Sequence, residues 1–246
     1  MNKCLNIGHR GARNKAPENT IASFRQALID GADGFELDVQ LTKDKVPLVV
    51  HDETLNRTAG VNRYVKDLSY KEIKNLDAGS WFSSKFRGQR FPTLYETLEF
   101  FAEDSIFINI ELKNDRVDYP GLEEKVLDLL GNGYQRENII ISSKCLDSIA
   151  KIGSLRREVK VGLLLQNRIP FWLKEENDLV RTKNFFSLHP QEKLMSHLMP
   201  FAGNFHLIPW TVNHKKTMKR FIGQNCFGII TDYPEILSKC MLEIDL

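Results

Sequence analysis

The 246-residue sequence predicts a (β/α)8 barrel, the TIM-barrel architecture, with a small insertion after the second strand. Eight short apolar runs are spread along the chain, and most are separated by stretches with the i, i+3, i+4 apolar spacing of amphipathic helices. Strands that alternate with helices form parallel sheets, and eight such units in about 250 residues are typical of a barrel. A doubly wound open sheet is the alternative, although the glycine-rich phosphate-binding sequence usual in that fold is absent.

The predicted strands follow one another from the N-terminus to the C-terminus. They are 5–8, 34–41, 106–113, 138–143, 159–165, 184–189, 206–212 and 227–232. The clearest helices are predicted at 21–29 and 93–103, where apolar residues recur at helical spacing. Pro92 precedes Thr93 and Glu96, which form a capping-box pattern that marks the start of the second of these helices.

The polar segment 52–91 interrupts the alternation of strands and helices. It is far longer than the loops of about 2–6 residues that usually connect a strand to a helix. Ser69 and Glu72 form a second capping box, which predicts a short helix inside the segment. Because long ordered insertions on such scaffolds often cover the active-site mouth, we interpret the chain as one domain, 1–246, that carries this insertion.

Composition excludes several classes of protein. Lys and Arg number 34 and Asp and Glu 32, a net charge of +2 without the basic clusters of a nucleic-acid-binding protein. No apolar run has the length of a transmembrane helix or signal peptide, so we expect no integral membrane segment. The cysteines lack CxxC spacing, which favours a reducing compartment and a cytoplasmic protein. They are Cys4, Cys145, Cys226 and Cys240. The sequence gives no indication of the oligomeric state.

Polar and ionisable side chains gather where the predicted strands end. In a (β/α)8 barrel the active site lies at the carboxyl ends of the strands. Any one of these residues alone is more often structural than functional, but their coincidence at one end of the barrel predicts a site. The candidates are His9, Arg10, Glu36, Asp38, His51, Glu111, Lys113 and Trp210.

Three of the candidates are carboxylates that could share one cation. Glu36 and Asp38 are two residues apart on a strand, so both project to the same side. Burying two such charges inside a barrel is costly unless a cation compensates them. Glu111 on the next predicted strand completes an all-oxygen set, which suits Mg²⁺ or Ca²⁺ rather than zinc, with Mn²⁺ as a further candidate.

The remaining charged residues favour a phosphate ester as the substrate. A cation together with Arg10 and Lys113 makes a positively charged site suited to a phosphodiester. His9 and His51 follow different strands and could act as general base and general acid. The chain has no GxxxxGK[ST] sequence, which argues against a P-loop nucleotide hydrolase.

Taken together, the motifs of the chain resemble those of the glycerophosphodiester phosphodiesterase family. They are HRG (9–11), PENT (17–20), E-x-D (36–38), HD (51–52), E-x-K (111–113), WTVN (210–213) and TDYP (231–234), in the order of the family. The resemblance spans almost the whole chain and implies a (β/α)8 barrel that hydrolyses glycerophosphodiesters to glycerol 3-phosphate and an alcohol. The segment 52–91 is similar to the small insertion of that family. One departure is Lys144, where members often carry Phe after two serines.

The resemblance also implies a role for each candidate. It makes His9 and His51 the catalytic pair, Glu36, Asp38 and Glu111 the metal ligands, Arg10 and Lys113 phosphate contacts, and Trp210 an aromatic residue on the glycerol side. Our hypothesis is that His9 removes a proton from the nucleophile and His51 protonates the leaving alkoxide. The nucleophile is either the glycerol 2-hydroxyl, which would give a cyclic phosphate, or water.

Two other functions remain as alternatives. One is a related metal-dependent barrel phosphodiesterase that acts on lysophospholipids. The other is a barrel without catalytic activity that binds a phosphorylated ligand. In each case the expected partner is a small molecule, and under the favoured hypothesis it is a glycerophosphodiester.

Overall fold

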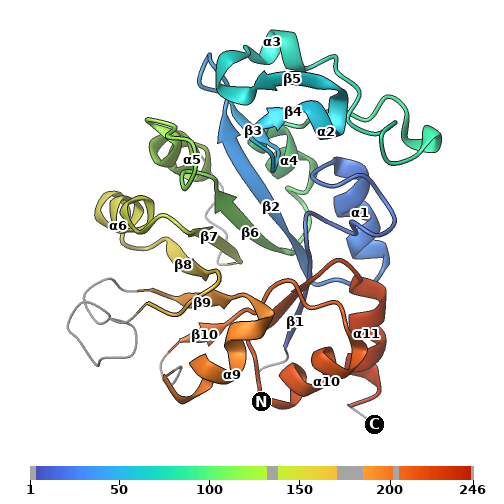
Figure 1. Ribbon diagram of the computed structural model, residues 1–246, viewed down its shortest axis with the longest axis vertical. Coiled ribbons are helices and arrows are strands. Elements are labelled where there is room, and N and C mark those ends of the chain that lie inside the picture. The colour runs from blue at the N-terminus through green and yellow to red at the C-terminus, as the bar shows by residue number, and fades with distance from the viewer. Residues whose placement is uncertain (1–3, 132–137, 171–184, 202–204, 245–246) are drawn as a thin grey trace.

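The computed structural model describes residues 4–131, 138–170, 185–201 and 205–244. Figure 1 looks onto a ring of strands with helices on its outside. The strands are all parallel in the order β10-β9-β8-β7-β6-β2-β1-β11, and the main-chain N–H of Phe227 donates to the carbonyl of Leu207 across the remaining gap. The structure is therefore a nearly closed (β/α)8 barrel, as predicted, and the open-sheet alternative is wrong.

The predicted order of elements is confirmed. The barrel strands are β1 (Leu5–Gly8), β2 (Gly34–Leu41), β6 (Phe107–Leu112), β7 (Ile139–Ser143), β8 (Lys160–Leu165), β9 (Ser187–Pro190), β10 (His206–Leu207) and β11 (Gly228–Thr231). The surrounding helices are α1 (Ile21–Ile29), α4 (Leu94–Phe100), α5 (Leu122–Gly131), α6 (Leu146–Leu155), α9 (Met195–Leu198), α10 (Lys215–Gly223) and α11 (Pro234–Leu242), with 3-10 turns at Glu192–Leu194 and Met199–Phe201. The first residue of the predicted strand 184–189 lies outside the described residues.

One predicted strand is much shorter than expected. The apolar run 206–212 forms a regular strand only at its first two residues, β10. The N–H groups of Ile208 and Trp210 still donate to β9, but Pro209 has no main-chain N–H to donate toward β11 and Pro190 has none to donate back from β9. Trp210 therefore lies beyond the strand and not at its end, although a parallel bridge to Gln191 keeps its backbone beside β9.

Helix starts were better predicted than helix ends. Thr93 caps α4, and its capping box with Glu96 is formed as expected. The helix ends at Phe100, before the predicted limit of residue 103. Within the insertion, the carboxylate of Glu72 accepts a hydrogen bond from the Ser69 N–H at 2.8 Å, which completes the second predicted capping box.

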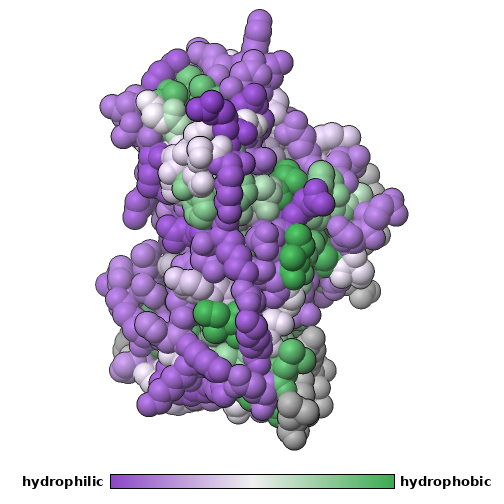
Figure 2. Space-filling model, turned by 90° about the vertical axis from the view of Figure 1, so that its right-hand side faces the viewer, coloured by the Kyte–Doolittle hydropathy of each residue, from purple (hydrophilic) through white to green (hydrophobic). Residues whose placement is uncertain are grey.

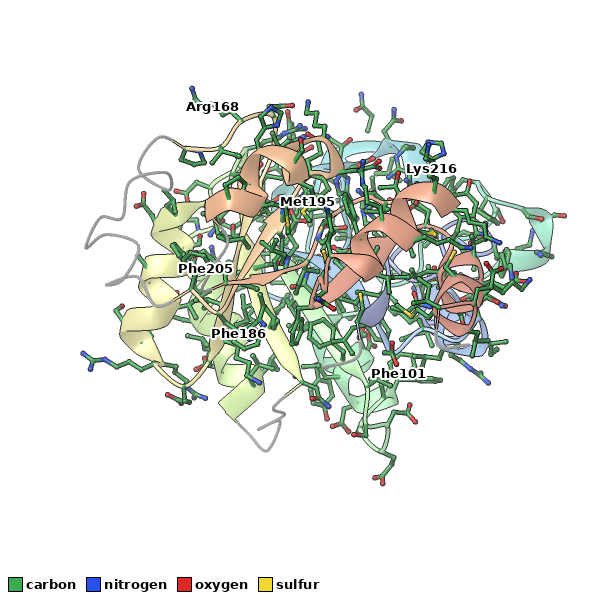
Figure 3. The ribbon with its side chains drawn as sticks, turned by 90° about the horizontal axis from the view of Figure 1, so that it is seen from below. Phe101, Arg168, Phe186, Met195, Phe205 and Lys216 are labelled. Carbon is green, nitrogen blue, oxygen red and sulfur yellow. The ribbon has the colours of Figure 1, made fainter. Side chains whose placement is uncertain are left out.

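Side chains alternate between the inside and the outside of the barrel. On β2, the outward-facing Phe35 stacks on Phe24 of α1 with 4.2 Å between ring centroids. In Figure 3, Lys216 at the start of α10 and Arg168 after β8 lie on the upper side, whereas Phe186 before β9 lies on the lower side. The upper side carries the carboxyl ends of the strands, and there we expect the site.

The segment after the second strand folds against its own small core. β3 (Pro47–Val49) pairs antiparallel with β2, and β4 (Thr54–Leu55) pairs with β5 (Val61–Tyr64). The short helices are α2 (Asn56–Ala59) and α3 (Tyr70–Ile73), with 3-10 turns at Val65–Asp67 and Ser84–Phe86. Eight buried residues form a cluster separate from the main core: Leu48, Val50, Leu55, Val65, Leu68, Ile73, Ala78 and Phe91. It stays a prediction that the chain is one domain, 1–246, with an insertion at about 52–91.

The surface carries no large concentration of apolar groups on the face shown in Figure 2, which is mostly hydrophilic with small separate hydrophobic groups. Exposed large hydrophobic residues are scattered over several elements, which is normal for a folded protein. They are Ile29, Tyr64, Trp81, Tyr95, Phe100, Leu155, Leu242 and Ile244. Within the described ranges, every helix is too short or too polar to cross a membrane.

Candidate active site

The fold brings the three predicted carboxylates together. β2 and β6 are neighbours in the barrel, and their register places Asp38 directly beside Glu111. Glu36 lies two residues before Asp38 and faces the same way. One carboxylate oxygen from each residue lies within 4.8 Å of the others, and all three residues are buried.

This carboxylate cluster fits a divalent cation. The Glu36 Oε1 and Asp38 Oδ1 atoms are buried and have no hydrogen-bond partner. Burial, together with the charges of Asp38 and Glu111, raises the pKa of Glu36. Carboxylate oxygens without a hydrogen bond in a barrel interior are costly, and a hard cation bound through oxygen atoms would compensate them.

Two cations beside the cluster keep part of it ionised. The Lys113 Nζ donates to Glu111 Oε1 at 3.0 Å and lies 3.5 Å from Asp38 Oδ1. The Arg10 Nε lies 3.2 Å from the other oxygen of Asp38. Burial would raise the pKa of Asp38, but Arg10 and Lys113 hold it well below its usual range. The phosphate contacts implied by the sequence thus lie at the edge of the carboxylate cluster.

A left-handed turn places Arg10 in this position. Arg10 has φ 52° and Gly11 has φ 87°, and a Cβ on Gly11 would lie 2.4 Å from Ser23 Oγ. Only glycine fits there without strain. The turn directs the Arg10 main-chain N–H to Glu36 Oε2 at 2.9 Å, while the Asn19 amide donates to Asp38 Oδ2 at 2.9 Å. The HRG and PENT motifs therefore hold the carboxylate cluster from one side.

Lys144 points toward the site, which the sequence alone did not reveal. Its Nζ lies 3.5 Å from Glu111 Oε1 and 5.5 Å from the centroid of the Trp210 ring. The Trp210 indole N–H donates to the His189 carbonyl at 2.7 Å, which fixes the plane of the ring. Trp210 thus stands at the rim of the site, on the side of β7 and β9.

His9 is paired with an aspartate that the sequence analysis left without a role. The His9 Nδ1 lies 2.6 Å from Asp232 Oδ1. Burial lowers the pKa of His9, Arg10 acts in the same direction, and Asp232 opposes both. Burial would raise the pKa of Asp232, but the hydrogen bond from His9 contributes to lowering it to about 2. A neutral imidazole bonded through Nδ1 leaves Nε2 free to accept a proton.

Asn213 holds this pair through both ends of its side-chain amide. Its Nδ2 donates to Asp232 Oδ2 at 2.7 Å, and its Oδ1 accepts from the Asp232 N–H at 2.9 Å. The helix α10 begins at Lys215 after the cap residue His214. The side chain of Asn213 is thus used to orient Asp232 against His9.

His51 is the second histidine with an aspartate on Nδ1. Its Nδ1 lies 2.7 Å from Asp52 Oδ1, and the hydrogen bond from His51 holds the pKa of Asp52 well below its usual range. The backbone of this loop is held from β2, because the Gln40 side-chain amide donates to the carbonyls of Val50, His51 and Asp52 at 3.1, 2.9 and 2.9 Å. Sequence reasoning missed Gln40, although it continues the inward-facing row of Glu36 and Asp38.

Asp232→Asn is expected to reduce kcat by about 100-fold or more. An asparagine amide can donate to His9 Nδ1, which favours the tautomer with a proton already on Nε2 and removes the base. Steady-state kinetics on the folded variant measures this. Asp30→Asn is the matched control, because Asp30 is a buried aspartate that pairs with Lys15 and not with a histidine. A change below about threefold in Asp232→Asn would contradict a catalytic role for the pair.

Residues 9–236 match the model of the Glycerophosphoryl diester phosphodiesterase family. The chain belongs to this family. A family member named glycerophosphodiester phosphodiesterase, from Caldanaerobacter subterraneus subsp. tengcongensis, is 42% identical, and the match covers 96% of each chain. The resemblance found in the sequence is therefore confirmed.

Solved structures with this family's fold agree with the barrel. A phosphodiesterase of Oleispira antarctica, in complex with the product sn-glycerol 3-phosphate, matches with a TM-score of 0.85 and 25% identity over 98% of this chain and 96% of that one. A glycerophosphodiester phosphodiesterase of Agrobacterium tumefaciens matches with a TM-score of 0.82 and 26% identity over 97% and 100%. Family membership identifies the chain as a hydrolase of glycerophosphodiesters.

Proposed function

We propose that the protein hydrolyses glycerophosphodiesters to glycerol 3-phosphate and an alcohol, with one divalent cation held by Glu36, Asp38 and Glu111. The observation that carries this proposal is the buried carboxylate cluster, whose oxygens lie within 4.8 Å of one another at the end of the barrel where two histidine–aspartate pairs also lie. The product bound to the Oleispira antarctica relative supports the choice of glycerol 3-phosphate. An all-oxygen set favours Mg²⁺ or Ca²⁺, with Mn²⁺ as a third choice.

In the proposed mechanism, positive charge surrounds the phosphate. When bound, the cation would stabilise the negative charge that develops on the phosphoryl oxygens. Arg10 and Lys113 add fixed positive charges beside Asp38 and would orient the phosphate in the same field. The Arg10 guanidinium and the Lys113 ammonium are already held in place by carboxylates, so they need little reorganisation during the reaction.

The two histidines divide the proton transfers. His9, kept neutral by burial, removes a proton from the nucleophile, and Asp232 stabilises the imidazolium that forms. His51, bonded to Asp52 through Nδ1, protonates the leaving alkoxide from Nε2. The arrangement serves either nucleophile, the glycerol 2-hydroxyl or water.

Release of glycerol 3-phosphate from glycerophosphocholine, with and without a chelator, tests the proposed function. We expect release that stops in excess chelator and returns when Mg²⁺, Ca²⁺ or Mn²⁺ is added. Lysophosphatidylcholine is the comparison substrate. Faster cleavage of the lysophospholipid than of glycerophosphocholine would replace this proposal with the lysophospholipid alternative, and binding of glycerol 3-phosphate without turnover would favour the inactive barrel.

A prediction on specificity concerns the glycerol end of the substrate. The Trp210 ring at the rim can pack on the carbon face of a glycerol unit. The charged group near this ring is Lys144. We expect glycerophosphoethanolamine, glycerophosphocholine and glycerophosphoglycerol to have kcat/KM values within about 100-fold of one another, since a few weak contacts contribute about 1–3 kcal/mol. Bis(nitrophenyl) phosphate, which lacks glycerol, should be a much poorer substrate.

Trp210→Ala should reduce this preference for glycerol esters by lowering kcat/KM for glycerophosphocholine more than for bis(nitrophenyl) phosphate. Phe100→Ala is the control, because Phe100 is an exposed aromatic residue at the end of α4. Equal cleavage of the glycerol-free diester and the glycerol esters by the wild-type protein would identify a broad phosphodiesterase instead.

The proposal also includes a cytoplasmic location, with a small molecule and not a nucleic acid as the partner. The four cysteines of the chain are all free thiols, which supports a reducing compartment.

A further inference from the structure

We infer that Glu18 is a positioning residue that fixes the two histidine–aspartate pairs relative to each other; the inference rests on the proposed function. Glu18 lies in the loop between β1 and α1, within the PENT motif, and its side chain is 2% exposed. It touches neither histidine. Its carboxylate instead contacts three guanidinium groups, and each of these leads to a different part of the site.

The first connection leads to His51. Arg57 binds Glu18 with both terminal nitrogens, at 2.7 Å to Oε1 and 3.0 Å to Oε2. The Nε of the same guanidinium donates to Asp52 Oδ2 at 2.7 Å, while the other oxygen of Asp52 holds His51. All three bonds use the planar fork of an arginine, which a lysine could not reproduce.

The second connection leads to His9. The Arg13 Nε donates to Glu18 Oε2 at 3.1 Å, and its Nη1 lies 3.7 Å from Asp232 Oδ2. The opposite oxygen of Asp232 is the one that holds His9. Arg13 is 39% exposed and its contact with Asp232 is longer, so this connection is weaker than the one through Arg57.

The third connection leads to the carboxylate cluster. The Arg10 Nη1 donates to Glu18 Oε1 at 2.8 Å, and its Nε lies beside Asp38. Burial would raise the pKa of Glu18, but the hydrogen bond from Arg57 and the charges of Arg10, Arg57 and Arg13 lower it to about 2. Glu18 is therefore an ionised centre without which three guanidinium groups would repel one another.

The connection through Arg57 also crosses between two parts of the chain. Arg57 belongs to α2 in the insertion, whereas Glu18 belongs to the barrel loop before α1, so their ion pair joins the insertion to the barrel. His51 stands at the base of the insertion and His9 at the end of β1. Glu18 thus fixes the distance between the proposed acid and the proposed base. A misplacement of about 1 Å can reduce a rate by about 100-fold, so the effect on catalysis should be large.

The test is Glu18→Gln, assayed at saturating Mg²⁺ with glycerophosphocholine and with the nitrophenyl ester of glycerol 3-phosphate. We expect kcat to fall by about 10- to 100-fold on both substrates, with KM changed by less than about threefold, because both the acid and the base are displaced. Arg57→Lys should behave differently. It loosens only the connection to His51, so its loss on glycerophosphocholine should largely disappear on the nitrophenyl ester, which needs little protonation.

Glu123→Gln is the matched control. Glu123 is also a buried glutamate, 4% exposed, but it lies in the first turn of α5 and is bonded to Asn114, Ser148 and Lys151. It should lose stability without losing kcat. Glu18→Asp, which keeps the charge, should recover part of the activity that Glu18→Gln loses. If Glu18→Gln does not fold, the two substrates are compared in Arg57→Lys and in Arg13→Lys.

Several results would overturn the inference. For Glu18→Gln they are an unchanged kcat, a loss of kcat equal to that of Glu123→Gln, or a kcat that returns to the wild-type value at a higher Mg²⁺ concentration. For Arg57→Lys the contradicting result is a loss of kcat of the same size on both substrates. Failure of the proposed function is distinguishable from these, because the wild-type protein would then release no glycerol 3-phosphate from either substrate.

Discussion

Exhaustive chelation is expected to abolish hydrolysis, and addition of Mg²⁺, Ca²⁺ or Mn²⁺ is expected to restore it. The reason is the cluster of Glu36, Asp38 and Glu111, whose buried oxygens lie within 4.8 Å of one another. Without a cation these charges repel one another and repel the phosphate. Dialysis against a chelator, followed by an assay of glycerol 3-phosphate release over a titration of each ion, measures both the dependence and the preferred ion. Full activity after complete chelation would contradict the proposal that hydrolysis needs a cation.

Glu36→Ala should have the same effect on activity without unfolding the chain. It removes one ligand, so thermal unfolding of the variant should no longer respond to the cation. For the wild-type protein at about 100 times the dissociation constant, binding should add about 2.7 kcal/mol, or about 5–10 °C in Tm. The control Glu123→Gln should keep the full shift. A normal cation-induced shift in Glu36→Ala would contradict its role as a ligand.

The metal-free protein should also show the electrostatic penalty of the cluster directly. Burial raises the pKa of Glu36 in the folded state above its unfolded value. The stabilising contribution of such a group is complete below the unfolded pKa and is lost as pH rises through the folded pKa. Without a cation, Glu36→Gln should therefore be more stable than the wild-type protein at neutral and alkaline pH, and saturating Mg²⁺ should reverse that order.

The barrel and the carboxylate cluster could be predicted because both depend on local periodicity. Because side chains alternate between the two faces of β2, Glu36 and Asp38 both face inward. The parallel order of the strands places β6 beside β2. The length of β10 could not be predicted from hydropathy, because Pro190 and Pro209 lack main-chain N–H groups that a regular ladder on both sides of this apolar run would need.

The residues that orient the histidines were harder to predict, since their roles depend on neighbours far away in the sequence. Asp232 meets His9 only after the barrel closes from β11 to β1. No sequence pattern marks Glu18 as functional, and its role becomes visible only from the arginines that surround it in the structure. Gln40 did carry a signal, because it continues the inward-facing row on β2, but the spacing does not reveal that it holds the His51 backbone.

His9→Ala and His51→Ala should each lower the chemical step by about 10²–10⁴-fold in a folded protein that still binds the cation. Both histidines are held through Nδ1 by an aspartate, at 2.6 and 2.7 Å, so the two sites look alike in their hydrogen bonds. They differ in burial. The His9 side chain is 10% exposed, and burial lowers its pKa, which suits a base that must be neutral before the reaction. The His51 side chain is 29% exposed, which suits an acid that takes up a proton from solvent in each cycle.

The leaving group separates the two roles. With the nitrophenyl ester of glycerol 3-phosphate, the departing oxygen needs little protonation, so His51→Ala should recover much of its lost rate while His9→Ala should not. Single-turnover kinetics at saturating Mg²⁺ isolates the chemical step, and His197→Ala serves as the control because His197 is an exposed histidine on α9. Recovery of His9→Ala instead would reverse the assignment and make His51 the base. Recovery of neither variant would mean that each histidine acts on the phosphate by charge or position, and acid–base catalysis by this pair would then have to be abandoned.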